Sequence, residues 1–309
     1  VGNVIGSNIF NLLVVLGACG AIRPFAVQLR WDYAASVGVA AALFFMIVGD
    51  HFVSRTEAII LLVLFAVFVA MTVRDALTNR IEEEEEYKSI TPLRCAIYIV
   101  GGLTAIVCGG DLVVECAKEI ALALGMSQTL VGLTVVALGT SLPELVTSVV
   151  ASRKGENGLA LGNVIGSNIF NMMFVIGVCS ILATIGVKRE TIIRDIPLSL
   201  VCAILLLIFG YLAVGDRSHM ILGHFDGFIF LIIFAVYVLM MVFQAMRARN
   251  NQEVVQLETM ENEELMIMSY PKSLLCIVGG AAAIAFGGDL TVDAASRIAI
   301  DFGMSQNLV

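Results

Sequence analysis

One short stretch of the chain places a carboxylate beside hydroxyl groups inside an apolar segment. Residues 131–152 read VGLTVVALGTSLPELVTSVVAS, with Glu144 near the middle. A charged side chain at bilayer depth costs about 2.5 kcal/mol or more, and it is usually retained for a function. The hydroxyl groups of Thr140 and Ser141 lie within one helical turn of Glu144. Because hard cations such as Ca²⁺ and Na⁺ prefer oxygen ligands, this stretch predicts a cation site.

Pro143 predicts an irregular backbone directly before Glu144. Proline has no N–H, and its ring clashes with the carbonyl group four residues earlier, which here belongs to Gly139. We therefore expect a kinked helix in which the carbonyl groups around Gly139 and Thr140 lose their usual partners. Those carbonyl oxygens would add to the cation ligands.

The string GNVIGSNIFN occurs twice, at residues 2–11 and 162–171, and supplies further polar groups. Its polar side chains recur at intervals of four residues, which places them on one helix face. This face comprises Asn163, Ser167 and Asn171 in one copy and Asn3, Ser7 and Asn11 in the other. If the helices that carry Glu144 and Asn171 form an antiparallel pair, their polar faces can meet near the midplane. In a single helix, Asn and Ser can instead serve only to hold helices together.

The elements that must hold these residues are membrane helices. Charged residues make up 14% of the 309 residues, against about 25% in soluble domains. Apolar runs of roughly 20 residues, the length of a membrane-spanning helix, recur along the whole chain. We expect an all-α, polytopic membrane protein with nine hydrophobic segments, approximately 4–22, 33–49, 56–74, 95–121, 127–152, 159–184, 192–214, 222–246 and 273–300, and a stub from 304.

Parts of the chain repeat one another. GGDLVVECA at residues 109–117 parallels GGDLTVDAA at residues 287–295, and GMSQTLV at 125–131 parallels GMSQNLV at 303–309. Duplicated halves with polar, glycine-interrupted helices are typical of secondary transporters, and consecutive modules of five helices are inverted in the membrane. Asp111 and Asp289, each after two glycines, are expected either to line a water-filled path or to cap a broken helix.

Two acidic stretches divide the chain into one complete five-helix module and a second, split module. Residue 309 aligns with 131 and residue 1 with 161, so the second module is expected to be circularly permuted and to lack the counterpart of residues 132–160. The expected parts are residues 1–74 (three helices of the second module), 75–92 (acidic linker), 93–246 (complete module), 247–271 (acidic linker) and 272–309 (first helix and stub of the split module).

At these residues the chain resembles the cation/Ca²⁺ exchanger superfamily, and within it the prokaryotic Na⁺/Ca²⁺ exchanger-like proteins. The family motif G-x-T-x-x-A-x-G-T-S-x-P-E matches residues 132–144, and G-N-x-x-G-S-N-x-x-N matches both copies of the ten-residue string. The resemblance implies an inverted repeat of five-helix halves. It also implies exchange of Ca²⁺ for Na⁺, or for H⁺, by alternating access at a midplane site, in a multi-pass protein of the prokaryotic inner membrane.

The resemblance also assigns the cation ligands. By motif match they are Glu144, Thr140, Ser141, Ser167, Asn171, Ser7 and Asn11. The family's second glutamate falls in the stretch that the split module is expected to lack. Some exchangers have aspartate in one half where this chain has Asn11 and Asn171, which changes the charge of the site.

Other functions are distinguished by their requirements. A Ca²⁺/H⁺ antiporter would use the same scaffold, a cation channel would need no counter-transport, and a structural membrane protein would tolerate loss of the Glu144 charge. We expect no enzyme, because the chain has no Ser/His/Asp array, HExxH motif or nucleotide-binding loop. We expect no cofactor, nucleic acid or obligatory protein partner; the expected partners are the lipid bilayer and the transported Ca²⁺ and Na⁺, or H⁺.

Overall fold

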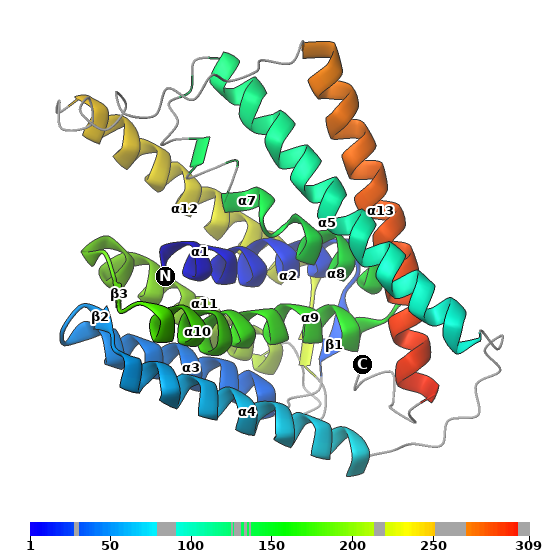
Figure 1. The fold of residues 1–309 in the computed structure, drawn as a ribbon, viewed down its shortest axis with the longest axis horizontal. Coiled ribbons are helices and arrows are strands. Elements are labelled where there is room, and N and C mark those ends of the chain that lie inside the picture. The colour runs from blue at the N-terminus through cyan, green and yellow to red at the C-terminus, as the bar shows by residue number, and fades with distance from the viewer. Residues whose placement is uncertain are drawn as a thin grey trace.

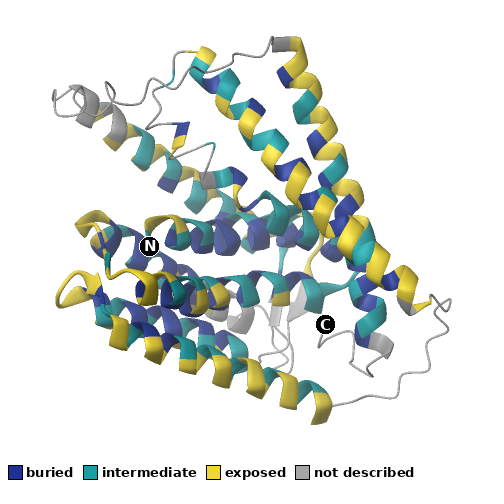
Figure 2. Cartoon of the chain, viewed as in Figure 1, coloured by how far each residue is buried: buried dark blue, intermediate teal, exposed yellow. Residues whose placement is uncertain are grey.

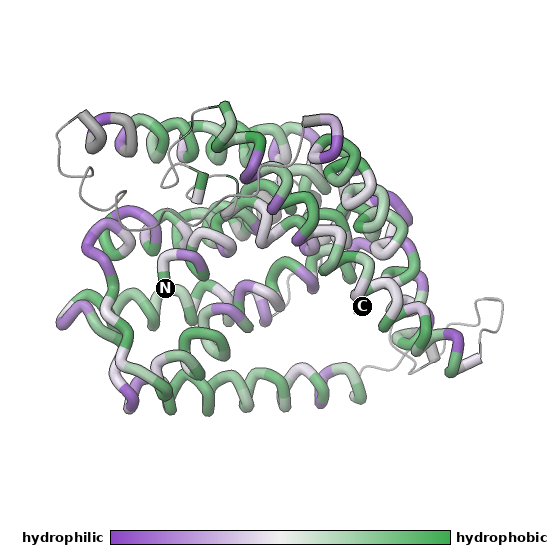
Figure 3. The backbone as a smooth tube through the Cα atoms, turned by 45° about the horizontal axis from the view of Figure 1, so that its top comes forward, coloured by the Kyte–Doolittle hydropathy of each residue, from purple (hydrophilic) through white to green (hydrophobic). Residues whose placement is uncertain are grey.

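The computed structural model describes residues 1–27, 31–78, 91–124, 126, 131–132, 135, 137–212, 220–250 and 270–301. These residues form a mainly helical assembly (Figure 1) whose long helices are largely apolar (Figure 3). Seven of the described helices are long and apolar enough to cross a bilayer, which confirms a polytopic helical membrane protein. They are Gly2–Ile22, Trp31–Val48, Arg55–Thr78, Leu93–Ala123, Asn157–Leu182, His224–Gln244 and Pro271–Ala299.

The other two expected segments, 127–152 and 192–214, are divided among shorter described elements. The first contains α7 (Ala137–Gly139) and α8 (Leu142–Lys154), separated by a turn. The second contains the π-helical turn η4 (Thr191–Asp195) and α11 (Ile196–Leu212). Most of the two expected acidic linkers (79–90 and 251–269) and the stub (302–309) lie outside the described residues.

The two copies of the ten-residue string form the most buried helices. One span consists of α1 (Gly2–Phe10), η1 (Asn11–Val15) and α2 (Leu16–Ile22); the other consists of α9 (Asn157–Ile169), η3 (Phe170–Val175) and α10 (Ile176–Leu182). The apolar stretches of these spans are 67% and 50% buried, against 11% for Arg55–Thr78. The string therefore lies at the centre of the assembly, as Figure 2 shows.

The remaining helices surround this centre. They are α3 (Trp31–Val48), α4 (Arg55–Thr78), α5 (Pro92–Ala123), α12 (His224–Asn250) and α13 (Tyr270–Asp301). Helix α4 packs on α10 and η3, α12 packs on α2, and α11 packs on α3. Two short antiparallel pairs join distant loops: β1 (Phe25–Val27) with β4 (Met220–Leu222), and β2 (Phe52–Val53) with β3 (Ile185–Gly186).

Helices α5 and α13 pack against each other in antiparallel orientation (Figure 1) through reciprocal glycine contacts. A Cβ atom added at Gly109 would lie 2.7 Å from the carbonyl oxygen of Gly280. A Cβ atom added at Gly280 would lie 2.7 Å from the carbonyl oxygen of Gly109. Only glycine lets the two backbones approach so closely, as in other membrane helix pairs.

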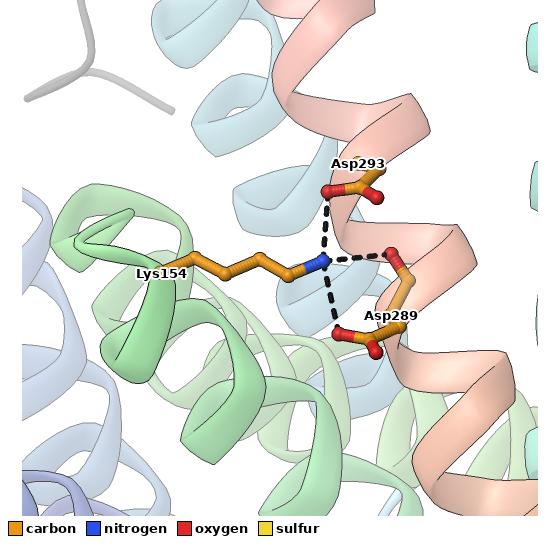
Figure 4. A network of polar contacts seen from close by, with 3 residues as sticks. All are labelled: Lys154, Asp289 and Asp293. Carbon is orange, nitrogen blue, oxygen red and sulfur yellow. Dashed lines mark hydrogen bonds and ion pairs between the residues drawn. The ribbon is translucent and has the colours of Figure 1, made fainter.

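Lys154 ties the end of α8 to α13 (Figure 4). Its Nζ atom lies 2.9 Å from Asp289 Oδ1 and 2.7 Å from Asp293 Oδ1, and it donates to the Asp289 carbonyl oxygen at 3.2 Å. Both aspartates are more than half exposed on α13. Both α5 and α13 are continuous helices, so neither Asp111 nor Asp289 caps a broken helix.

We predict that Gly109→Ala destabilises the protein by about 1–3 kcal/mol, because the added methyl group overpacks the α5–α13 contact. Gly101→Ala is the matched control on the same helix, since nothing lies within 4 Å of a Cβ atom there. This control should be neutral or stabilising by about 0.5–1 kcal/mol, from better helix propensity. Thermal unfolding in detergent measures both; equal effects of the two substitutions would contradict the close contact.

Candidate cation-binding site

The helix that carries Glu144 is broken immediately before it. Helix α7 ends at Gly139, a turn follows, and α8 begins at Leu142 with Pro143 and Glu144 in its first turn. The prediction of a kinked but continuous helix is therefore wrong: one helix ends and a second begins after the turn. The physical reason is that proline is well tolerated in the first helical turn, where its missing N–H would have no partner.

This break places Glu144 at the positive end of a helix. The first turn of a helix presents backbone N–H groups without helical partners, and its dipole favours negative charge. Glu144 was expected in the middle of a helix, but the structure places it at a helix start. The break therefore gives the carboxylate a favourable electrostatic position.

One carboxylate oxygen of Glu144, Oε2, is buried and has no hydrogen-bond partner among the described residues. The Glu144 backbone is fixed from the neighbouring helix: Asn163 Nδ2 donates to the Glu144 carbonyl oxygen at 3.3 Å and to Ser148 Oγ at 2.9 Å. A buried, unpaired carboxylate is costly. A cation at this position would compensate that cost.

Helices α8 and α9 form the expected antiparallel pair. A tight turn at Gly155, with φ of 90°, reverses the chain between them. This conformation favours glycine because it is left-handed. The reversal brings the polar side chains that precede and follow the turn to neighbouring positions.

The turn before α8 also contacts the other copy of the string. The hydroxyl groups of Ser141 and Ser7 are 3.0 Å apart and share a hydrogen bond. Ser141 is buried, whereas Thr140 is exposed in the turn. Ser167 is half-buried on α9. The structure thus joins Ser7 to the Glu144 region across 134 residues of sequence.

Four asparagines connect α1 and η1 to α9 and η3 by reciprocal hydrogen bonds. Asn11 Nδ2 donates to Asn168 Oδ1 at 3.1 Å, and Asn171 Nδ2 donates to Asn8 Oδ1 at 3.1 Å. Asn8 Nδ2 donates to the Asn168 carbonyl oxygen at 3.3 Å, and Asn168 Nδ2 donates to the Asn8 carbonyl oxygen at 3.4 Å. Equivalent residues of the two strings therefore make equivalent bonds.

Reasoning from spacing missed Asn8 and Asn168. Each directly follows the serine of its string, and so lies about 100° around the helix from the polar face. The available signal was the duplication itself, since both copies keep an asparagine at this position. The spacing rule selected residues four apart, two of which also bond to the other copy, and it overlooked the adjacent asparagines that accept those bonds.

The backbone widens at the two expected asparagine ligands. The N–H of Leu16 bonds to the Asn11 carbonyl, and the N–H of Ile176 bonds to the Asn171 carbonyl, each five residues earlier. Such π-helical turns inside α-helices occur frequently at functional sites. Both copies therefore carry the same irregularity at the same residue.

The broken helix and the two widened helices contact one another through buried polar groups. This arrangement defines a class of protein, the multi-pass membrane transporters. The chain belongs to the sodium/calcium exchanger protein family, whose model matches residues 1–74 and 95–243. It is thus an integral membrane protein of a family of cation/Ca²⁺ antiporters, as the sequence predicted.

Among the described residues, no three His, Cys, Asp or Glu side chains cluster as a metal site.

Known proteins of similar sequence and structure agree with this assignment. The chain is 34% identical over 249 residues to CaxA of Alkalimonas amylolytica, named as an antiporter, covering 77% of this chain and 76% of CaxA. It is 33% identical to the inner membrane protein YrbG of Escherichia coli, over 66% of each chain. A solved structure of the sodium–calcium exchanger NCX_Mj matches with a TM-score of 0.63 and 29% identity, covering 77% of this chain and 75% of that one.

We predict that Pro143→Ala weakens Ca²⁺ binding. Alanine restores an N–H that can bond to the Gly139 carbonyl, so α7 and α8 can join and move the Glu144 carboxylate. The Ca²⁺ concentration at half-maximal uptake should rise about tenfold, as for other residues that support metal ligands. Pro271→Ala, in the first turn of α13 and exposed, is the matched control and should leave this concentration unchanged. An unchanged value for Pro143→Ala would remove the break from the mechanism.

Proposed function

We propose that the protein exchanges Ca²⁺ for Na⁺ by alternating access at the site of Glu144. The observation that carries this proposal is the buried Oε2 atom of Glu144, which has no partner in the described part of the chain. The proposed ligands are the seven residues predicted from the motifs: Glu144, Thr140, Ser141, Ser167, Asn171, Ser7 and Asn11. Their carboxylate, hydroxyl and amide oxygens are the ligand types that Ca²⁺ takes.

Charge explains why such a site would couple two ions. An empty carboxylate site is expensive to carry through a closed, low-dielectric intermediate. A bound cation neutralises the site and lowers that cost. A loaded site therefore passes between the two sides more readily than an empty one, which favours exchange over leak.

The counter-ion is proposed to be Na⁺. Support comes from the similar solved structures, which are those of a sodium–calcium exchanger. The second candidate is a Ca²⁺/H⁺ antiporter, because the unpartnered Glu144 carboxylate can also be neutralised by a proton.

We further infer that residues 93–246 form one exchanger module, and that residues 1–74 and 272–309 contribute to a second, inverted module. The reciprocal hydrogen bonds of the four asparagines support this organisation. So does the reciprocal glycine contact between α5 and α13.

We predict that Glu144→Gln abolishes Ca²⁺ uptake into proteoliposomes without loss of folding. The amide removes the charge that Ca²⁺ requires, but it also removes the cost of a buried charge, so thermal stability should be unchanged or higher. Glu115→Gln on α5, where the carboxylate is exposed, is the matched control and should retain uptake. Normal uptake by the Glu144→Gln protein would overturn the assignment of the site.

The counter-ion is identified by loading proteoliposomes with Na⁺ or with protons and following Ca²⁺ entry. We expect uptake under an outward Na⁺ gradient at constant pH. Uptake driven only by an outward H⁺ gradient would identify the Ca²⁺/H⁺ antiporter instead. Ca²⁺ flux that needs no counter-ion would identify a channel.

A further inference from the structure

We propose that Asn8 and Asn168 are positioning residues, which orient the amide groups of Asn171 and Asn11 so that their carbonyl oxygens face the transported cation. The inference rests on the proposed function, because it assigns Asn11 and Asn171 as ligands. It extends that function to two residues outside the predicted ligand set.

The side-chain amides of Asn8 and Asn168, the bridging amides, are fixed by the backbone. Asn168 Nδ2 donates to the backbone carbonyl of Asn8 at 3.4 Å, and Asn8 Nδ2 donates to the backbone carbonyl of Asn168 at 3.3 Å. A carbonyl oxygen only accepts hydrogen bonds. If either amide rotated by 180°, its own oxygen would face that carbonyl, so each bridging amide is held in one orientation.

The bridging amides in turn orient the side-chain amides of the two proposed ligands, Asn11 and Asn171. Because Asn168 Nδ2 faces a backbone carbonyl, Asn168 Oδ1 faces the opposite way and accepts from Asn11 Nδ2 at 3.1 Å. A reversed Asn11 amide would set two acceptor oxygens against each other. Asn8 Oδ1 accepts from Asn171 Nδ2 in the same way, at 3.1 Å.

The Asn11 side-chain oxygen, Oδ1, takes no part in these hydrogen bonds. Asn11 is 0% exposed, and its Oδ1 atom has no hydrogen-bond partner in the part of the chain that the structure describes. Buried polar atoms are nearly always partnered, so an oriented and unpartnered oxygen points to a ligand. A cation is the complementary ligand, since the reversed amide would present its N–H₂ group and repel one.

Burial makes this orientation effective. Asn8 is 0% exposed and Asn168 is 1% exposed, so water does not compete for the bridging hydrogen bonds. In water an asparagine amide turns freely between its two orientations. Here the reciprocal bonds select the orientation that presents oxygen, before any cation arrives.

A double-substitution cycle tests the proposal. Asn168→Leu removes the acceptor that orients Asn11, and should raise the Ca²⁺ concentration for half-maximal uptake by about 10- to 100-fold, as is usual for residues that orient metal ligands. Asn11→Asp replaces the amide with a carboxylate, which presents oxygen in either orientation. In the Asn11→Asp background one carboxylate oxygen faces the acceptor Asn168 Oδ1. Adding Asn168→Leu should therefore cause no further rise, or a fall, because the acceptor that it removes no longer orients residue 11.

The outcomes separate positioning from simple helix adhesion. An equal rise from Asn168→Leu in both backgrounds would overturn the proposal, since it would show that Asn168 only holds the helices together. Tyr237→Phe removes another interhelical hydrogen bond, to Asp195 at 3.2 Å, and should leave the half-maximal concentration unchanged. If Asn168→Leu fails to fold, the equivalent cycle with Asn8→Leu and Asn171→Asp gives the same two readings.

A different result would show that the proposed Ca²⁺ exchange at Glu144 is wrong. In that case Glu144→Gln would retain Ca²⁺ uptake whatever residue stood at position 168. If Glu144→Gln abolishes uptake while the cycle shows independent effects, the exchanger site stands and only the positioning role is overturned.

Discussion

The structure depends on one constraint: polar groups buried in a membrane protein must find partners within the protein or in a bound ion. Glu144 and the asparagines of the repeated string lie in the interior of a mainly apolar, membrane-spanning assembly. Their amide groups meet this constraint by bonding to one another across the two copies. Glu144 Oε2 and Asn11 Oδ1 do not, within the described residues, and both belong to the cation ligands that we propose.

The irregular backbone of the site is subject to the same constraint. The break before α8 places Glu144 at a helix start, and the widened turns fall at Asn11 and Asn171. Such backbone is tolerated at membrane depth only where protein or a polar cavity covers it. The surrounding helices provide this cover, and the glycine contacts between α5 and α13 show how closely these helices can pack.

Much of this could be predicted from local patterns. Apolar run length predicted the membrane helices. The carboxylate of Glu144 beside hydroxyl groups predicts a cation site, and this stays a prediction. The prediction at Pro143 was wrong in form, because a proline pattern alone does not distinguish a kink from a helix start. Asn8 and Asn168 were missed because a spacing of four residues reports one helix face, whereas each of these asparagines lies about 100° around the helix from that face and bonds to the second copy.

The sequence by itself determined the class of protein, the duplication and the residue types available to a cation, because length, hydropathy and motif identity are properties of the chain. Only the tertiary structure decided which amide bonds to which, that Ser7 meets Ser141, and that α13 packs on α5. These contacts join residues more than 130 positions apart. They depend on the rotation and depth of each helix, which are set by packing against all of its neighbours rather than by the helix's own sequence.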